Sequence, residues 1–524
     1  MPITSEQVNK TITERIDEWG EKNPDGLCYD YNHDQLTYSS LKRQSDALAV
    51  YLNNQVTISV LKDPIIVYGH MSSYMLISFI GSAKAGIAYI PIDVSMPVER
   101  IKQIIEKANP SLMICTQELP DELMNIDVSA VTIAELKDIL NVYQYQIPEV
   151  STAVKGEEIF YIIFTSGSTG TPKGVQISHD NLQSFSDWML AGFSLQEQKR
   201  FINQAPFSFD LSVMDLYPCL LLGGTIVPLD KETSGNMKTL YQTLPKLAVN
   251  VWVSTPSFVE LCLLDSQFNQ QNMKELTHFI FCGEVLNKES AKQLLERFPN
   301  VQLYNTYGPT EATVAFTSVR LSKEVVDAFA SIPLGRVKYD SLISICDENG
   351  HVLPEGQAGE IILIGPSVSI GYLADNEKTA KVFYKDDDRQ AYKTGDCGII
   401  EDGFLFFKGR MDFQVKLHGY RIELEDIENN LKETDYVQNC IVVPKWREGK
   451  VDSLVAFVVV NEHSFEKEYQ LTAAIKKQLL KSMPAYMIPR KWIYKQELPL
   501  TSNSKIDRKQ LSDEVNSWEH LMQL

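Results

Sequence analysis

A loop of small, hydroxylated and basic residues directly follows a continuous apolar strand in the first half of the chain. Residues 160–175 read FYIIFTSGSTGTPKGV. In such a loop glycines let the backbone approach an anion, hydroxyl and N–H groups donate to phosphate oxygens, and Lys173 adds a positive charge. The spacing departs from the GxxxxGK[ST] loop of nucleoside triphosphatases. We interpret the segment as a phosphate-binding loop; the alternative is a solvated Gly/Ser turn.

The segment 250–310 alternates short apolar runs with amphipathic runs. This order predicts strand, helix, strand, helix, strand. Such alternation is typical of an α/β domain with a mainly parallel sheet covered by helices, whose ligands bind where the strands end. From about residue 340, short strands with Gly turns such as EIILIG and FLFFKGR predict an antiparallel subdomain.

The last part of the chain predicts a small α+β domain. It contains VKLHGYRIELEDIENNLKE, two apolar runs and the amphipathic run QLTAAIKKQLLKSMP. No Pro- or Ser-rich linker precedes it, so we expect a short hinge at Asp412. The predicted domains are therefore residues 1–411 and residues 412–524.

Composition excludes several classes of function. The 524 residues carry a formal net charge of -19, which argues against a nucleic-acid partner. The eight cysteines lie far apart, without a CxxC pair or clustered histidines, so neither a zinc site nor a disulfide framework is indicated. The N-terminus is polar, and no apolar run reaches the roughly 18 residues of a membrane span. We expect a cytoplasmic protein without membrane insertion.

The phosphate-binding loop and further motifs resemble the adenylate-forming (AMP-binding) superfamily, which includes amino-acid adenylation domains, acyl-CoA ligases and luciferases. The further motifs occur in the family's order: LTYSSL (36–41), KAGIAYIPID (84–93), FSFDLSVMDLY (207–217), NTYGPTEAT (305–313), YKTGD (392–396), GRMDFQVKLHGYRIE (409–423) and NSKIDRK (503–509). The resemblance implies a large N-terminal domain, a small mobile C-terminal domain, and ATP and Mg²⁺ as cofactors. It also implies two steps, in which an acyl adenylate forms and the acyl group is then transferred to a thiol.

The resemblance also implies the residues of the nucleotide site. Thr310, Glu311 and Lys505 would be catalytic: Thr310 would donate to the α-phosphate, Glu311 would bind Mg²⁺, and Lys505 would bridge the substrate carboxylate and ATP. Tyr307 would stack on adenine and Asp396 would hold the ribose hydroxyls, although a core aromatic and a turn aspartate are the alternatives. The full predicted ATP-binding set is Thr165, Ser166, Gly167, Ser168, Thr169, Lys173, Asn305, Thr306, Tyr307, Gly308, Pro309, Thr310, Asp396, Lys408, Gly409, Arg410 and Lys505.

Asp210 indicates the class of substrate. It lies in the largely apolar segment FSFDLS, and a buried carboxylate needs a cationic partner. In the amino-acid-activating branch this partner is the substrate ammonium; the alternative is a Lys or Arg of the protein. The resemblance completes the substrate pocket with Leu211, Met214, Cys282, Val314 and Lys505. Their bulk suits a side chain of methyl size, and no histidine is placed to activate Cys282 as a nucleophile.

The finer wording of NQAPFSFDLSVMDLYPCL and MPAYMIPRK is similar to the members of the superfamily that load D-alanine onto a carrier protein for lipoteichoic acid D-alanylation. We therefore expect D-alanine as substrate, a separate phosphopantetheinylated carrier protein as partner, and a monomer. In the second step the C-terminal domain would rotate at Asp412 and present the loop around Gly419. The alternatives are adenylation of another small amino acid, an acyl-CoA ligase, which Asp210 disfavours, and a non-catalytic nucleotide-sensing protein.

Overall fold

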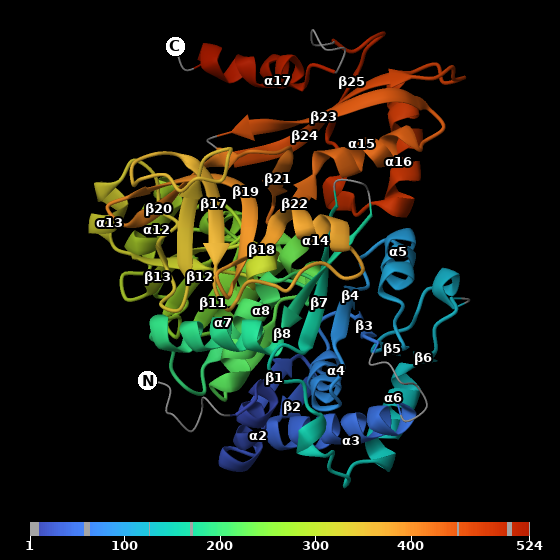
Figure 1. The fold of residues 1–524 in the computed structure, drawn as a ribbon, viewed down its shortest axis with the longest axis vertical. Coiled ribbons are helices and arrows are strands. Elements are labelled where there is room, and N and C mark those ends of the chain that lie inside the picture. Colours follow the sequence, from blue (N-terminus) through green and yellow to red (C-terminus); the bar gives the residue numbers. More distant parts are fainter. Residues whose placement is uncertain are drawn as a thin grey trace.

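The large N-terminal part of the chain contains two mainly parallel sheets, and a smaller part made of strands and helices lies at the other end of the molecule (Figure 1). The computed structural model describes residues 10–56, 63–124, 126–167, 171–447, 450–499 and 506–522.

The first sheet has the strand order β15-β14-β13-β12-β11-β9-β10-β1-β2. Its central strands are parallel, and antiparallel strands flank them at both edges. Helices follow the parallel strands, as the alternation of apolar and amphipathic runs predicts. The strands are β1 (Leu27–Tyr31), β2 (Asp34–Thr37), β9 (Arg200–Asn203), β10 (Thr225–Pro228), β11 (Val251–Ser254), β12 (His278–Phe281), β13 (Gln302–Tyr307), β14 (Thr317–Leu321) and β15 (Arg336–Val337).

The second sheet has the strand order β6-β5-β3-β4-β7-β8 and is parallel except for its last pair, which forms a hairpin. The phosphate-binding loop connects the two strands of this hairpin. The strands are β3 (Ile65–Gly69), β4 (Tyr89–Asp93), β5 (Leu112–Cys115), β6 (Ala130–Val131), β7 (Ile159–Thr165) and β8 (Lys173–Ser178).

Helices cover the two sheets and bury the main apolar cluster between them. Every residue of α8 is buried, because this helix lies inside the core instead of on the surface. The helices of this part are α2 (Ile12–Lys22), α3 (Tyr38–Val56), α4 (Ser73–Lys84), α5 (Val98–Ala108), α6 (Ile133–Val142), α7 (His179–Gly192), α8 (Leu211–Leu221), α9 (Lys231–Gly235), α10 (Met237–Thr243), α11 (Pro256–Leu263), α12 (Lys288–Arg297), α13 (Lys323–Ala328) and α14 (Asn376–Val382).

An antiparallel sheet and a separate C-terminal unit complete the fold. The antiparallel sheet contains β16 (Leu342–Cys346), β17 (Gly359–Ile364), β18 (Phe383–Asp386), β19 (Arg389–Glu401) and β20 (Phe404–Arg410). The C-terminal unit, at the top of Figure 1, has its own apolar cluster. It contains β21 (Gln414–Leu417), β22 (Tyr420–Glu423), α15 (Leu424–Lys432), β23 (Val437–Arg447), β24 (Lys450–Val460), α16 (Glu468–Ser482), β25 (Lys491–Tyr494) and α17 (Arg508–Met522).

The structure confirms the predicted fold class of a large α/β part with an antiparallel subdomain and a small α+β part. Asp412 lies between β20 and β21, and the domain boundary at this position stays a prediction. Within the described ranges, we find no helix whose length and apolar character would suit a bilayer.

Candidate functional site

The phosphate-binding loop connects β7 to β8. Gly167 is required there, because a Cβ atom at this position would lie 2.2 Å from the backbone oxygen of Thr171. The Thr165 hydroxyl is buried and has no hydrogen-bond partner among the described residues. Such an unpaired donor suits an anion held at the loop. Ser168 and Thr169, which belong to the predicted ATP-binding set, lie outside the described residues.

A cavity of about 50 Å³ brings many of the predicted nucleotide and substrate residues together. Its volume corresponds to a few water molecules, so it suits a small ligand. Residues of the C-terminal hairpin β21–β22, which includes Gly419, form one of its walls. The predicted residues that line it are Asp210, Leu211, Cys282, Gly308, Pro309, Thr310, Val314, Asp396 and Arg410.

Asp210 is the buried carboxylate of this cavity. It is 9% exposed, and one of its oxygens accepts a 2.6 Å hydrogen bond from the Thr310 hydroxyl. Burial raises the pKa of Asp210, and the hydrogen bond from Thr310 opposes this effect. No described Lys or Arg forms an ion pair with it within 4.0 Å. Lys416 and Arg421, which line the same cavity, lower the pKa of Asp210 from beyond ion-pair distance, so the carboxylate can still accept a cationic group from a ligand.

Two successive residues with positive φ lie at the part of the cavity wall that Val314 forms. Thr313 has φ 54° and Val314 has φ 69°, values that β-branched residues rarely adopt. The turn exposes Val314 to the cavity, and its carbonyl oxygen lies 3.5 Å from the Cys282 sulfur. Burial raises the pKa of the Cys282 thiol, which agrees with a wall residue and not a nucleophile.

Met214 does not line the cavity. It is fully buried in α8 and packs in the apolar cluster between the sheets. Leu211 is the first residue of α8 and lines the cavity, whereas Met214 lies further along the helix and contacts the core. Met214 can therefore influence the cavity only through the apolar cluster that it shares with Leu211.

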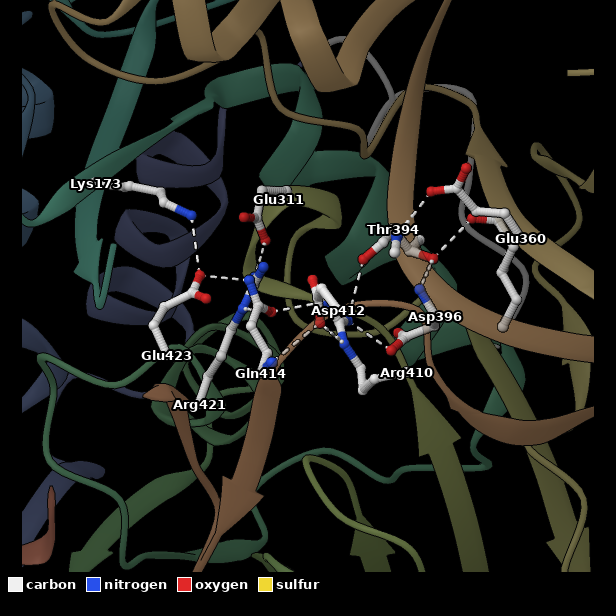
Figure 2. Close-up of polar contacts among 12 residues, drawn as sticks. Lys173, Glu311, Glu360, Thr394, Asp396, Arg410, Asp412, Gln414, Arg421 and Glu423 are labelled. Atoms are coloured by element: carbon white, nitrogen blue, oxygen red, sulfur yellow. Dashed lines mark hydrogen bonds and ion pairs between the residues drawn. The ribbon is translucent and has the colours of Figure 1, made fainter. Parts of the chain in front are cut away.

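The predicted ribose and adenine residues are already linked to one another. One Asp396 oxygen accepts a hydrogen bond of 2.5 Å from the Tyr307 hydroxyl, and the other accepts one of 2.6 Å from Arg410. Arg410 also donates to Asp412 and to Gln414 (Figure 2). The predicted ribose carboxylate is thus connected to the predicted hinge through Arg410.

The remaining predicted nucleotide residues that the structure describes do not line the cavity of about 50 Å³. Asn305 and Thr306 are buried and donate to the carbonyl oxygens of Pro333 and Phe281. Lys408 is exposed on β20, and neither it nor Gly409 lines the cavity. Lys505 lies outside the described residues.

Residues of β22 contact the phosphate-binding loop and Glu311. Arg421 donates to a Glu311 oxygen at 2.7 Å, and its backbone oxygen accepts from the Ser166 hydroxyl at 2.8 Å. Lys173 donates to Glu423 at 3.1 Å (Figure 2). Burial alone would raise the pKa of Glu311, but the charges of Arg421 and Lys173 outweigh it and lower this pKa to about 2.

Arg421 and Glu423 are not among the residues that the sequence predicts for the site. Both lie in the GYRIE segment of a motif that the resemblance includes, and that motif is the only signal that could have indicated them. Their pairing with Glu311 and Lys173 joins residues more than a hundred positions apart.

Glu311 is also the predicted ligand of Mg²⁺. The described residues contain no group of three or more His, Cys, Asp or Glu side chains placed to hold a metal ion. A single carboxylate nevertheless fits Mg²⁺, because this ion commonly takes one or two carboxylates and completes its shell with phosphate oxygens and water.

Two larger cavities lie beside the small one. One, of about 460 Å³, borders Phe209, Thr255, Leu264 and His418. The other, of about 410 Å³, borders the phosphate-binding loop at Ser166. Because Phe209 borders all three cavities, both of the larger ones adjoin the cavity of about 50 Å³ that contains Asp210. We call this small cavity the acyl cavity.

Further ion pairs hold the C-terminal unit against the N-terminal part. Lys450 donates to Glu260 at 2.6 Å, and Arg100 lies 3.8 Å from the buried carboxylate of Asp426. We call the arrangement with these contacts and the β22 contacts the docked posture. Burial raises the pKa of Asp426 to about 6, although Arg100 opposes the shift.

Two family models match this chain. The model described as "AMP-binding enzyme" matches residues 16–373, and the model described as "AMP-binding enzyme C-terminal domain" matches residues 426–505.

Curated relatives match nearly the whole chain. A protein of Listeria monocytogenes serotype 4b named D-alanine–D-alanyl carrier protein ligase is 60% identical over 507 residues, which cover 97% of this chain and 99% of the relative. A protein of Bacillus cytotoxicus with the same name is 47% identical over 97% of this chain and 100% of its own length.

Solved structures share the fold. The Vibrio cholerae adenylation domain AlmE in complex with glycyl-adenosine-5'-phosphate has a TM-score of 0.81 at 24% identity, covering 96% of this chain and 97% of that one. PA1221, described as containing adenylation and PCP domains, has a TM-score of 0.80 at 23% identity, covering 96% of this chain and 84% of that one.

Because Asp426 lies beside Arg100 of the N-terminal part, its raised pKa predicts that docking of the C-terminal unit depends on pH. A carboxyl whose pKa rises on docking binds its proton more tightly there, so docking strengthens as pH falls from about 6 toward the ordinary value of 3.8. Besides Arg100, the charged or titratable groups that act on Asp426 are Glu423, Lys173 and Tyr486.

Energy transfer between dyes at the exposed positions Glu377 and Tyr469 would measure the docked fraction between pH 4.5 and 7.5. In the Asp426→Asn variant, we expect the pH dependence below pH 6 to disappear while the labelled wild-type chain retains it. Superimposable profiles for the two proteins would contradict the assignment to Asp426.

Proposed function

Because the chain belongs to the AMP-binding enzyme family, as its motifs predict, we propose that it activates D-alanine with ATP and transfers the D-alanyl group to the phosphopantetheine thiol of a separate carrier protein. The observation that carries the proposal is the 60% identity, over 97% of the chain, to a D-alanine–D-alanyl carrier protein ligase. In the first step the substrate carboxylate attacks the α-phosphorus of ATP, which gives D-alanyl adenylate and pyrophosphate. In the second step the thiol attacks the adenylate carbonyl and expels AMP.

Asp210 is proposed to bind the ammonium group of the amino acid. The carboxylate is buried and has no ion-pair partner among the described cationic side chains. An ammonium group would restore its ionised form and leave the substrate carboxylate directed away from it. Leu211, Cys282 and Val314 leave room for a small side chain. The D configuration follows from the names of the relatives and not from the shape of the pocket.

The proposed nucleotide site lies between the phosphate-binding loop and Asp396. Thr165 and Lys173 are placed to bind phosphates, and Asp396 is placed to accept hydrogen bonds from the ribose. Mg²⁺, when bound through Glu311, would offset the negative charge of the phosphates. Thr310 is within hydrogen-bond distance of Asp210, so it connects the amino-acid and nucleotide sites.

The docked posture is proposed to be the posture of the transfer step. The Gly419 backbone N–H donates to Glu284 at 2.6 Å, which holds the β21–β22 hairpin over the acyl cavity. The cavity of about 460 Å³ is lined by His418 and Tyr420, the neighbours of Gly419 in the chain, and is proposed to admit the phosphopantetheine arm. The carrier is proposed to be a separate protein, as in the names of the relatives.

The cellular setting is also proposed. The resemblance indicates lipoteichoic acid D-alanylation, a cytoplasmic location and a monomeric enzyme that uses ATP and Mg²⁺. The alternatives are adenylation of another small amino acid and formation of an acyl-CoA. Neither alternative agrees with the names of the curated relatives.

Exchange of labelled pyrophosphate into ATP measures the first step directly. We expect D-alanine to give the fastest exchange in a panel with L-alanine, glycine, D-serine, L-serine and short fatty acids. Since an apolar pocket discriminates one methylene by only about 1–3 kcal/mol, glycine should remain a detectable substrate. Fastest exchange with a fatty acid would refute the amino-acid assignment.

Replacing Asp210 tests the proposed ammonium contact. In the Asp210→Ala variant we expect loss of D-alanine-dependent exchange, because removing one partner of a buried charge pair costs ~2–5 kcal/mol. Nucleotide binding, measured by calorimetry, should persist. Exchange at the wild-type rate would remove Asp210 from the substrate pocket.

Two variants should separate the two steps. A Cβ atom at Gly419 would lie 2.4 Å from Thr255 Cγ2, and φ there is +84°. We therefore expect Gly419→Ala to slow transfer from preformed adenylate by on the order of tenfold, since left-handed backbone strain in other residues is ~1–2 kcal/mol. Lys505→Ala should instead slow adenylation, by roughly 10²–10³-fold. Single-turnover assays of each step would test this, and equal slowing of both steps by either variant would contradict the division of roles.

A further inference from the structure

Side chains and backbone of β22 contact the groups that we propose for Mg²⁺ and phosphate. Arg421 donates to Glu311, Glu423 accepts from Lys173, and the backbone oxygen of Arg421 accepts from Ser166. Figure 2 shows the Arg421–Glu311 and Lys173–Glu423 pairs side by side. A cation therefore contacts the proposed metal ligand, and an anion contacts the lysine of the phosphate-binding loop.

These contacts leave Glu311 no free carboxylate oxygen. One oxygen accepts from Arg421 at 2.7 Å, and the other accepts from the Tyr372 hydroxyl at 2.8 Å. Glu311 is 0% exposed, so its charge is balanced by the few groups that touch it. A divalent ion at the oxygen held by Arg421 would be repelled by the guanidinium at contact distance, so the binding of either cation there weakens the binding of the other.

At Lys173 the residue that β22 contributes is negatively charged, whereas at Glu311 it is positively charged. Glu423 accepts from Lys173 at 3.1 Å and also from the side chain of Gln414. Gln414 in turn accepts from Arg421 at 2.9 Å, so Arg421 and Glu423 are held as one unit. A phosphate that bound Lys173 would lie against the negative charge of Glu423, which is unfavourable.

We propose that β22 acts as an internal ligand of the phosphate site, in which Arg421 replaces Mg²⁺ at Glu311 and Glu423 replaces a phosphate at Lys173. This inference rests on the proposed function of the site. It goes further, because it makes the docked posture and bound magnesium pyrophosphate mutually exclusive. Arg421 is then a positioning residue for the transfer step, and pyrophosphate must leave before the hairpin docks.

The exclusion has a thermodynamic consequence. When a ligand binds only the undocked form, its apparent dissociation constant equals the intrinsic constant divided by the undocked fraction. Weakening the docked posture therefore strengthens binding of magnesium pyrophosphate. The same linkage means that magnesium pyrophosphate lowers the docked fraction.

Calorimetric titration of the ligand-free enzyme with magnesium pyrophosphate tests this consequence. We expect the Arg421→Gln variant to bind roughly three- to tenfold more tightly than the wild-type chain, because the internal competitor is weakened. Simple electrostatics would predict the opposite result, because removing a positive charge beside an anion site should weaken the binding of an anion. If Arg421 were instead a direct phosphate ligand or only a structural residue, binding would weaken or stay unchanged, and either result would overturn the proposal.

Matched variants give controls. Lys450→Gln removes the ion pair with Glu260, which lies outside the phosphate site, and should also tighten binding by loosening the docked posture. Lys381→Gln removes an exposed pair with Glu377 in the N-terminal part and should leave the affinity unchanged. Arg421→Lys keeps the charge but loses the planar fork, so it should fall between the wild-type chain and Arg421→Gln.

A second measurement does not depend on the folding of an Arg421 variant. Cysteines that replace Glu260 and Lys450 would lie close together in the docked posture, and of the native cysteines only Cys397 is not buried. Closing them with a cleavable bis-maleimide linker should abolish binding of magnesium pyrophosphate, and cleavage should restore it. Full binding by the closed enzyme would refute exclusion.

The two proposals fail in different ways. Both measurements use magnesium pyrophosphate without amino acid or carrier, so an incorrect D-alanine assignment leaves them unaffected. If D-alanine supports exchange but the closed enzyme still binds magnesium pyrophosphate, the proposed function stands and the internal-ligand proposal is wrong.

Discussion

A carboxylate that is removed from water needs a cation, and this requirement organises the centre of the molecule. Glu311 is 0% exposed and is neutralised by Arg421 at 2.7 Å. Asp210 is 9% exposed and has a hydrogen bond from Thr310 but no ion pair with a described Lys or Arg. One buried acid thus has its cation from the C-terminal unit, whereas the other is proposed to receive one from the substrate.

The two proposed steps can be described by the cations that these acids meet. In adenylation, the substrate ammonium would balance Asp210 and Mg²⁺ would balance Glu311. After pyrophosphate leaves, Arg421 would take over at Glu311 as the hairpin docks, and Gly419 would reach Glu284. Domain movement would then exchange one partner of Glu311 for another, so neither proposed posture would leave the carboxylate without a cation.

Local patterns predicted most of the fold, whereas long-range pairing escaped them. The strands and helices between 250 and 310 follow from periodicity, and motif position placed Asp210, Cys282 and Val314 at one cavity. The motif places Met214 in the substrate pocket, whereas the structure has it buried in the core, because motif spacing does not say which residues of α8 border the cavity. The contact between Glu311 and Arg421 depends on how two parts of the chain with separate apolar clusters meet, which no local pattern encodes.

The central claim is that Glu311 exchanges Arg421 for a metal ion when the nucleotide site is filled. A crystal structure of the enzyme with magnesium pyrophosphate tests this most directly. The account predicts a metal ion at Glu311, phosphate oxygens at Lys173, and Arg421 and Glu423 withdrawn with the hairpin. Magnesium pyrophosphate bound while Arg421 still donates to Glu311 and Glu423 still accepts from Lys173 would contradict it.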